Sequence, residues 1–405
     1  MLVVIGDNFS GALGAGLADD VVSVVSLSSQ HIDTLLVDDA AVGVLLQFGR
    51  LLIWGSCDDY CDLPSAGVLA AAIGGARCAR IDCSNPGQIS LSRSPRPFYL
   101  GSRSVVSVAV GARIAVALVS GGGVFELSSS DCAPRSVDEL PRAAVRIACG
   151  DGHCVVLDSA ACVFAWGDNF YGQCGVTCGD TVITRAVRVD AFDGSPLPCD
   201  SAGAAIVSDA ARGIISEIAC GAWSTALLTT SGDVYTTATF DDVGAESPLR
   251  RALDASSLQS FAVSGGDALG LGRVPVKSVS PLVLVHGLPA DVVGVAAGAR
   301  HYVATTKSGD AWMWGVDALP ARITPKSTSV GPPVSGSRPL DAGGTLLIER
   351  TLGARDGWGL VRLAVPTRVP VEELTRGCGA GEGEEGKRLV FRAVAGRRNT
   401  ILEVF

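Results

Sequence analysis

The sequence predicts an all-β protein, a seven-bladed β-propeller closed by pairing of its N- and C-terminal strands. A unit that is best preserved at residues 147–175 recurs in weaker copies along the chain, and self-similarity at intervals of tens of residues is typical of repeat folds. Seven anchor positions, mostly glycines, mark these copies. The 405 residues include 50 glycines and are 48% hydrophobic, which suits many short strands joined by turns.

Two copies share the same spacing of three features. An anchor glycine is followed three positions later by a histidine, in a position that we call the slot, and sixteen positions later by a Trp-Gly pair. Short apolar or β-branched runs on both sides of a turn predict two strands joined as a hairpin. The two copies are Gly150 with His153 and Trp166-Gly167, and Gly298 with His301 and Trp314-Gly315.

Five weaker copies complete the count of anchors. Four of them pair an anchor with a slot residue: Gly221 with Ser224, Gly111 with Ile114, Ser28 with His31, and Gly396 with Asn399. The fifth has Gly74 or Gly75 as its anchor and a turn at Gly87.

The incomplete copies at the two ends of the chain predict how the ring closes. The last copy, residues 390–405, has no second half, whereas residues 3–16 match residues 164–175 and have no first half before them. An N-terminal strand that completes the C-terminal sheet leaves neither terminal edge unpaired.

The repeated residue types have structural explanations. The anchor glycines fit places where backbones approach closely or a strand bulges. The tryptophans at 54, 166 and 314 are expected to pack between neighbouring sheets. The Asp-Asn pairs at 7–8 and 168–169 suit turns, because their short side chains bond to nearby backbone amides.

Together these residues resemble the repeat of the regulator of chromosome condensation family, and the resemblance covers most of the chain. A second match begins at Gly6, and a contracted third one spans residues 266–272. The resemblance implies a seven-bladed β-propeller. The residues of the best copy that are in register are Gly150, His153, Leu157, Trp166, Gly167, Asn169, Gly172, Gln173 and Gly175.

The resemblance also implies candidate site residues. In the exchange-factor branch of the family, an Asp and a His in or beside such slots contribute to nucleotide release from a small GTPase. Asp151, His153 and His301 occupy corresponding positions and are candidates to face a GTPase. In the alternative interpretation, which we favour, the histidines cap turns or form hydrogen bonds within the scaffold, since the slot recurs in blades without special roles.

Charge and cysteine content restrict the partners and the compartment. The net charge of −9 and the pI near 5.0 argue against general affinity for nucleic acid. No apolar stretch is long enough to span a membrane and the start of the chain does not resemble a signal peptide. The odd number of 13 cysteines predicts reduced thiols in an intracellular protein, cytoplasmic or nuclear.

No cofactor and no metal site are expected. Close cysteine pairs occur, but a zinc site needs about four converging ligands, and buried small apolar groups are the default role of such thiols. The pairs are Cys57 with Cys61, Cys78 with Cys83, Cys149 with Cys154, and Cys174 with Cys178.

These observations predict one propeller domain, residues 1–405, that acts as a non-enzymatic protein-interaction scaffold. No nucleophile elbow, phosphate loop or H-E-x-x-H motif is present. We expect inserted loops at about 178–213, 241–260, 321–345 and 375–388. Each loop is interpreted either as a binding element or as a tolerated insertion. The expected partner is a protein, either a small GTPase or a chromatin-associated protein. We expect no direct contact between this chain and nucleic acid. The alternative is a guanine nucleotide exchange factor for a Ran-like small GTPase.

Overall fold

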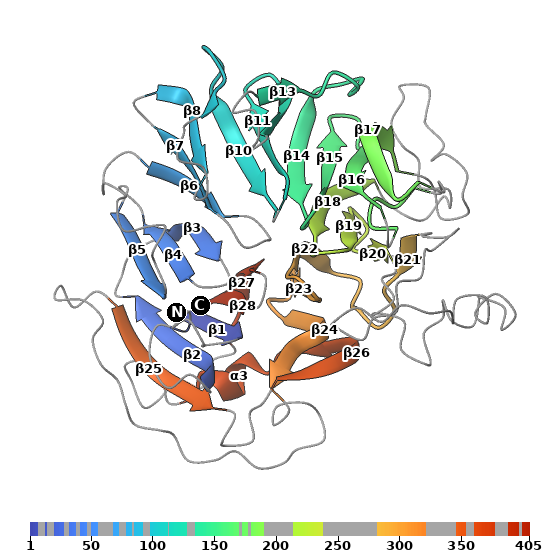
Figure 1. Cartoon of the computed structure of the whole chain (residues 1–405). Coiled ribbons are helices and arrows are strands. Elements are labelled where there is room, and N and C mark those ends of the chain that lie inside the picture. Colours follow the sequence, from blue (N-terminus) through green and yellow to red (C-terminus); the bar gives the residue numbers. More distant parts are fainter. Residues whose placement is uncertain are drawn as a thin grey trace, which may run out of the picture.

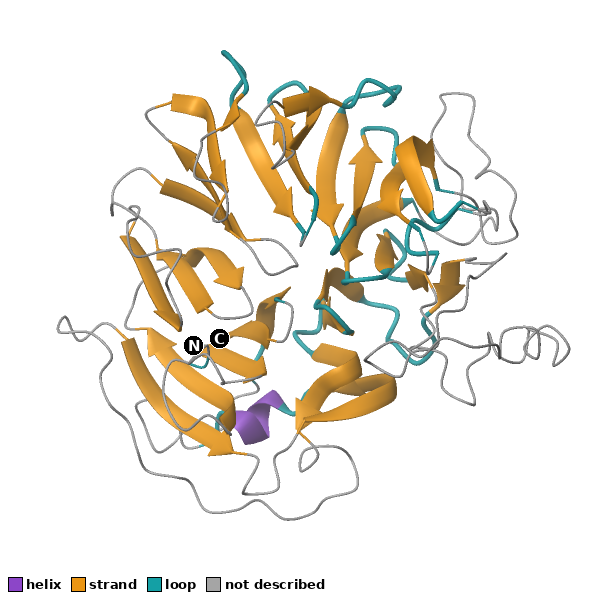
Figure 2. Cartoon of the chain, in the orientation of Figure 1, coloured by secondary structure: helices purple, strands orange, loops and turns teal. Residues whose placement is uncertain are grey.

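The strands of the computed structural model form seven antiparallel sheets around a common centre (Figure 1). Strands dominate the described part of the chain, and a short helix, α3 (Val371–Leu374), accompanies them (Figure 2). The structure describes residues 1–6, 13, 20–27, 32–37, 41–46, 50–55, 68–72, 78–82, 85–91, 98–111, 113–127, 134–169, 172–176, 180–189, 214–237, 282–320, 346–353, 360–376, 388–396 and 399–405.

We number the sheets as blades in chain order, and within each we give the strands from the centre outwards. Blade 1 contains β3 (Ile32–Val37), β4 (Ala41–Leu46) and β5 (Arg50–Gly55); blade 2 contains β6 (Val68–Ala72), β7 (Cys78–Asp82), β8 (Asn85–Leu91) and β9 (Phe98–Tyr99). Blade 3 contains β10 (Val105–Val110), β11 (Ala115–Val119), β12 (Val124–Leu127) and β13 (Pro134–Ser136); blade 4 contains β14 (Ala144–Cys149), β15 (His153–Asp158), β16 (Val163–Asp168) and β17 (Val182–Arg188).

The remaining three blades follow the same order, and the last includes both ends of the chain. Blade 5 contains β18 (Ile215–Cys220), β19 (Thr225–Thr229), β20 (Val234–Thr237) and β21 (Leu282–Leu284); blade 6 contains β22 (Val292–Ala297), β23 (His301–Thr306), β24 (Ala311–Pro320) and β26 (Leu360–Arg368); blade 7 contains β27 (Val390–Ala395), β28 (Asn399–Val404), β1 (Leu2–Gly6), β2 (Asp20–Leu27) and β25 (Leu346–Gly353).

The innermost strands contact one another in sequence around the centre. Strand β3 contacts β6, and contacts continue through β10, β14, β18 and β22 to β27, which contacts β3 again. The prediction of an all-β propeller is therefore confirmed, and its two ends meet in blade 7.

Strand β1 lies inside a sheet, between β28 and β2. Its register pairs Val3 with Leu402 on one side and with Val24 on the other. The amino group of Met1 donates a hydrogen bond to the carbonyl oxygen of Val404 at 3.0 Å. The terminal strands thus pair as the incomplete end copies predict, and four buried apolar side chains of β1, at positions 2–5, join the core.

Strand β25 is an addition that the repeat pattern does not predict. It pairs antiparallel with β2 as the fifth strand of blade 7, and its partners include Val25 with Ile348. Figure 1 shows this C-terminal segment beside the N-terminal β2. The chain leaves blade 6 after β24, contributes β25 to blade 7, and returns to blade 6 as β26.

Three positional predictions are corrected by the strand pairing. Residues 182–188, placed in an inserted loop, are the outer strand β17 of blade 4. Gly87, placed at a turn, lies within β8. In blade 1 the pair Ala41–Gly55 corresponds to His153–Gly167, so Ala41 occupies the slot. His31 and its proposed anchor, Ser28, lie outside the described residues. The other predicted insertions also lie outside them, apart from residues 375, 376 and 388.

The anchor glycines mark close approaches between blades, as predicted. In blades 3 to 6, a Cβ added at the anchor would press against the carbonyl oxygen of the next blade's anchor. Any side chain there would separate neighbouring blades. The successive anchors are Gly111, Gly150, Gly221, Gly298 and Gly396.

Apolar side chains fill the spaces between the blades. Trp166 is buried among residues of blades 3, 4 and 5, and Trp314 is buried among residues of blades 5 and 6. The ring of Trp314 stacks on Tyr302 with centroids 5.3 Å apart. These two tryptophans pack between sheets as expected. The side chain of Trp54 is outside the described part.

Candidate functional site

The two slot histidines lie at junctions between blades. His153 is fully buried at the start of β15, and its Nε2 atom lies 3.1 Å from Oγ1 of Thr225 in blade 5. His301 is buried at the start of β23, and its Nε2 atom lies 2.7 Å from Oγ1 of Thr400 in blade 7. Both threonines stand four positions after their own anchor glycine. Each imidazole therefore joins its own blade to the following one.

The bonding of Thr225 fixes the direction of its hydrogen bond with His153. The Thr225 hydroxyl donates to the carbonyl oxygen of Gln173 at 2.7 Å. A hydroxyl has one hydrogen to donate, so its oxygen accepts from the imidazole. His153 is consequently the neutral tautomer that carries its proton on Nε2.

Burial keeps both imidazoles neutral. Desolvation lowers the pKa of His153 to about 4, against a weaker opposing effect of a backbone hydrogen bond with Ser224. Desolvation alone lowers the pKa of His301 to about 4. A charged form in either place would be removed from water, which disfavours it. At neutral pH these histidines act as hydrogen-bonding groups of the scaffold.

The junction between blades 5 and 6 has the same contact with different residues. Ser224 occupies the slot of blade 5, and Tyr302 stands four positions after the anchor of blade 6. The Tyr302 hydroxyl donates a hydrogen bond to Oγ of Ser224. Three successive junctions therefore join a slot side chain to the anchor-plus-four side chain of the next blade. We call this contact the interblade clasp.

Asp151 contributes to a backbone belt next to the clasps. Its N–H donates to the carbonyl oxygen of Ala222 at 3.0 Å, and its own carbonyl accepts from Arg113 N–H at 2.7 Å. The N–H of Ala222 donates in turn to Ala299 in blade 6. Asp151 is largely buried, so its main chain links blades 3, 4 and 5.

The other repeat positions form structural contacts or turns. The indole N–H of Trp166 donates to Glu126 of blade 3 at 3.0 Å. Oδ1 of Asn169 accepts from the N–H of Cys174 at 3.1 Å, and the carbonyl oxygen of Asn169 accepts from Gly172. The glycines at 167, 172 and 315 all have positive φ, which glycine adopts without strain.

Three members of the predicted cysteine pairs have side chains that the structure describes, and all three are buried: Cys149, Cys154 and Cys174. Cys149 and Cys154 are free thiols. Burial raises the pKa of the Cys154 thiol. Within the described ranges, no three His, Cys, Asp or Glu side chains are arranged to hold a metal ion.

Sequence reasoning missed a repeated exposed apolar position on the innermost strands. Each of its four members stands five positions before an anchor glycine and is the bulged residue of its strand, between two registers of pairing. They are Val106, Val145, Val293 and Phe391, which are 50–70% exposed. In the sequence, this position is marked by an apolar residue five places before the anchor glycine.

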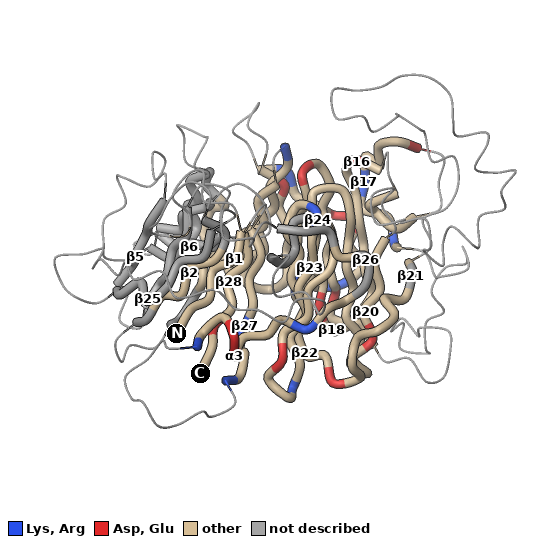
Figure 3. Tube along the Cα trace, turned by 90° about the horizontal axis from the view of Figure 1, so that it is seen from below, with Lys and Arg blue, Asp and Glu red and all other residues tan. Residues whose placement is uncertain are grey.

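These side chains belong to the face of the ring that carries both chain ends. The bulges lie at the start of the innermost strands, and the start of β27 is bonded to the C-terminus through Leu389 and Phe405. Phe405 is exposed and packs edge-on against Phe391, with centroids 5.6 Å apart. Figure 3 shows both chain ends on the lower side of the ring, near β27. We call the four residues plus Phe405 the apolar ring.

Comparison with known proteins identifies the repeat. Residues 144–173, which contain the slot residue His153, match the family model for the regulator of chromosome condensation (RCC1) repeat. Protein RCC1 of Candida albicans is 30% identical over 171 residues, which are 42% of this chain and 31% of that protein. Human RCC1 domain-containing protein 1 is 24% identical over 180 residues, which are 41% of this chain and 43% of that protein. The chain thus contains one stretch that matches the RCC1 repeat, and it resembles RCC1-like propeller proteins over about two fifths of its length.

Solved structures support the fold of this RCC1-like propeller. Yeast RCC1 (Prp20) bound to Kap60 has a TM-score of 0.60 at 17% identity, covering 99% of this chain and 88% of that chain. Human WBSCR16 has a TM-score of 0.60 at 14% identity, covering 100% of this chain and 99% of that chain. A further structure of Prp20p from Saccharomyces cerevisiae is described with its binding to Gsp1p and histones. The matches to the two curated relatives span less than half of their lengths.

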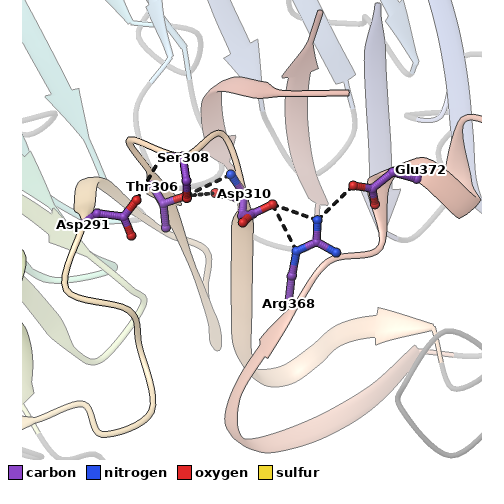
Figure 4. A network of polar contacts seen from close by, with 6 residues as sticks. All are labelled: Asp291, Thr306, Ser308, Asp310, Arg368 and Glu372. Atoms are coloured by element: carbon purple, nitrogen blue, oxygen red, sulfur yellow. Dashed lines mark hydrogen bonds and ion pairs between the residues drawn. The ribbon is translucent and has the colours of Figure 1, made fainter. Parts of the chain in front are cut away.

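A polar network on blade 6 of the RCC1-like propeller holds a turn against α3. Arg368 donates to Oδ1 of Asp310 at 2.8 and 3.0 Å and to Oε1 of Glu372 at 2.9 Å (Figure 4). The N–H of Asp310 donates to Thr306, and that of Ser308 to Asp291. All six side chains bond among themselves or to the adjoining turn, so the network is a structural brace. No helix in the described part is long and apolar enough to cross a membrane.

Proposed function

We propose that this RCC1-like propeller is a non-enzymatic protein-interaction scaffold that binds a protein partner through the face that carries the apolar ring. One observation carries the proposal: four innermost strands expose an apolar side chain at the same bulged position. Exposed apolar groups gathered on one face mark interaction sites more often than scattered ones do.

The bulges explain why these side chains point away from the core. A bulge inserts a residue that has no single partner on the neighbouring strand and turns the strand locally. At Phe391 the result is an aromatic ring that is 70% exposed beside a second exposed ring, that of Phe405. Aromatic groups are enriched among the residues that dominate binding energy at interfaces.

The clasps favour a structural role for the slot residues. His153 and His301 use their Nε2 atoms between blades and are buried. A partner would reach neither imidazole without separating blades. We therefore assign His153, His301 and Asp151 to the scaffold, and their contact with a GTPase stays a prediction.

Affinity purification with surface variants tests the proposal. The full chain serves as bait beside the double variant V293S/F391S and a control variant, V182S/V187S. The control removes two exposed valines from the outer strand β17, where exposure is comparable. We expect the wild type and the control to retain the same proteins and V293S/F391S to lose them. Equal retention by all three baits would exclude the apolar ring as the binding surface.

A guanine nucleotide exchange factor remains the second candidate, because Protein RCC1 of Candida albicans is 30% identical over the matched region. Such a factor displaces nucleotide contacts without covalent chemistry. Nucleotide release from a panel of small GTPases, measured with substoichiometric propeller, separates the candidates. Accelerated release would overturn the scaffold function. Unchanged release by every GTPase of the panel, together with partner retention through the apolar ring, supports it.

A further inference from the structure

Cys149 and Cys154 lie directly opposite each other at the end of blade 4 where the anchor is located. They are the last paired residues of β14 and β15, and four residues, 150–153, connect them. The N–H of Gly150 donates to the carbonyl oxygen of His153 at 2.9 Å. The next pair outward, Cys149 with Cys154, is therefore a non-hydrogen-bonded pair of the antiparallel ladder, in which side chains approach most closely.

This geometry is compatible with a disulfide. The Cα atoms of a non-hydrogen-bonded pair are about 4.5 Å apart, within the range of about 4.4–6.8 Å found across disulfides. The two Sγ atoms are 2.6 Å apart, while a disulfide bond measures about 2.0 Å. Both cysteines are free thiols here.

We propose that this cysteine pair is an oxidation site, at which hydrogen peroxide converts two thiols into a disulfide across β14 and β15. One thiolate attacks a peroxide oxygen, the O–O bond breaks, and a sulfenic acid and hydroxide form. The second sulfur attacks the sulfenic sulfur, the S–O bond breaks, and the oxygen leaves as water. In sum, two thiols and one peroxide give one disulfide and two waters, so the sulfurs are oxidised and peroxide is reduced.

A small oxidant is the class that fits the site. Cys149 is 1% exposed and Cys154 is not exposed, which excludes a bulky disulfide reagent from the folded protein. Burial raises the pKa of Cys154 and thereby keeps its reactive thiolate scarce. Reaction with peroxide is consequently slow, and it depends on local opening of the junction between blades 4 and 5.

The disulfide would act on the segment that contacts the next blade. The four enclosed residues include the N–H of Asp151, which bonds to Ala222, and the imidazole of His153, which bonds to Thr225. A bond between the flanking cysteines removes open conformations of this segment and leaves its contacts in place. Oxidation therefore stiffens the junction between blades 4 and 5.

Peptide mapping of the intact protein tests the proposal. The folded chain is treated with hydrogen peroxide, and its remaining thiols are alkylated after denaturation. We expect the peptide with residues 149–154 to be two hydrogens lighter and to carry no alkyl group on either cysteine. Reduction with dithiothreitol before alkylation should make both cysteines alkylatable again. The variants C149A and C154A should lose the change, whereas C162A, which alters a buried thiol in a separate apolar cluster, should keep it.

The wild-type map decides the outcome even if an alanine variant fails to fold. Fragmentation must place the lost hydrogens on Cys149 and Cys154. The proposal is overturned if both cysteines remain alkylatable after peroxide treatment. It is equally overturned if either one pairs with Cys174 or Cys220, or if oxidation yields only sulfinic acid.

Discussion

The imidazole of His153 belongs to blade 4, yet its Nε2–H donates to Oγ1 of Thr225 in blade 5, 3.1 Å away. The same relationship joins His301 to Thr400 two blades further on. The histidines that the sequence offers as candidate site residues thus hold the ring together. The clasp explains why these slots hold a polar residue: the slot side chain forms a hydrogen bond to a side chain of the next blade.

Loss of a clasp should lower stability without disturbing the surface. We expect H153A to reduce the free energy of unfolding by about 2–4 kcal/mol, since the change removes a buried hydrogen bond and leaves a cavity. Urea denaturation measures the change. The matched control is H286A, because His286 is exposed on a turn and should alter stability by less than about 0.5 kcal/mol. Equal effects of the two variants would refute the clasp.

The pairing of His301 with Thr400 can be measured as a coupling energy. H301A, T400V and the double variant form a double-mutant cycle, and we expect the double variant to cost about 1–2 kcal/mol less than the sum of the single variants. The Thr400 hydroxyl bonds to the imidazole at 2.7 Å, and valine preserves its shape. Strict additivity within about 0.3 kcal/mol would show that this contact contributes nothing.

Acidification should weaken the ring through both histidines. The pKa of each is near 6.5 in the unfolded chain and about 4 in the folded protein, so the unfolded state binds protons first as the pH falls. The stability contribution is fully present above pH 6.5 and is lost progressively between pH 6.5 and 4. The full effect is roughly 3 kcal/mol for each histidine, at about 1.4 kcal/mol per pKa unit.

Comparison of variants separates this effect from that of the carboxyl groups. The stability difference between the wild type and H153A/H301A should shrink as the pH falls from 7 to 5, as measured by urea denaturation at each pH. Glu217 acts in the opposite sense, because burial raises its pKa and favours its protonated form in the folded state. A difference that stays constant over this range would contradict buried, neutral imidazoles.

A side chain at an anchor glycine should open the ring. We expect G150A to reduce the free energy of unfolding by more than about 3 kcal/mol, because its Cβ would press on the imidazole of His153 and on the carbonyl oxygen of Gly221. G101A is the control: Gly101 has φ +69° but open space around the added Cβ. It should cost only about 1 kcal/mol for the left-handed backbone. Thermal unfolding followed by circular dichroism distinguishes the two variants.

The fold could be predicted from the sequence because the repeat spacing reports backbone constraints. Gly150 and Gly298 stand where only glycine fits between blades, and their spacing to the Trp-Gly pairs fixes two strands and a turn. Blade 1 was misplaced because the histidine at 31 resembled a slot residue, whereas the pairing of Ala41 with Gly55 sets the register. Strand β25 escaped prediction because it carries no repeat residue and pairs with a strand more than 300 residues away.

The candidate site was less accessible to sequence reasoning than the fold. The spacing located His153 and His301 but could not tell whether an imidazole faces solvent or the next blade. That orientation depends on Thr225 and Thr400, which belong to other copies of the repeat. The exposed position of Phe391 depends on a bulge in β27. Its place five residues before the anchor indicates a repeated position, but it does not indicate that the strand bulges there.

The pairing of the two ends of the chain leads to a last prediction. Val3 is fully buried in β1, where it pairs with Leu402 and contributes to the core of blade 7. We expect V3D to reduce the free energy of unfolding by more than about 3 kcal/mol, since a carboxylate there must stay buried or leave the sheet. V182D, an exposed position on β17, should cost less than about 1 kcal/mol. Proteolysis of the folded variants gives an independent measure: if β1 closes the ring, V3D is cut rapidly near both ends of the chain. Resistance of V3D equal to that of the wild type would mean that β1 is dispensable for closure.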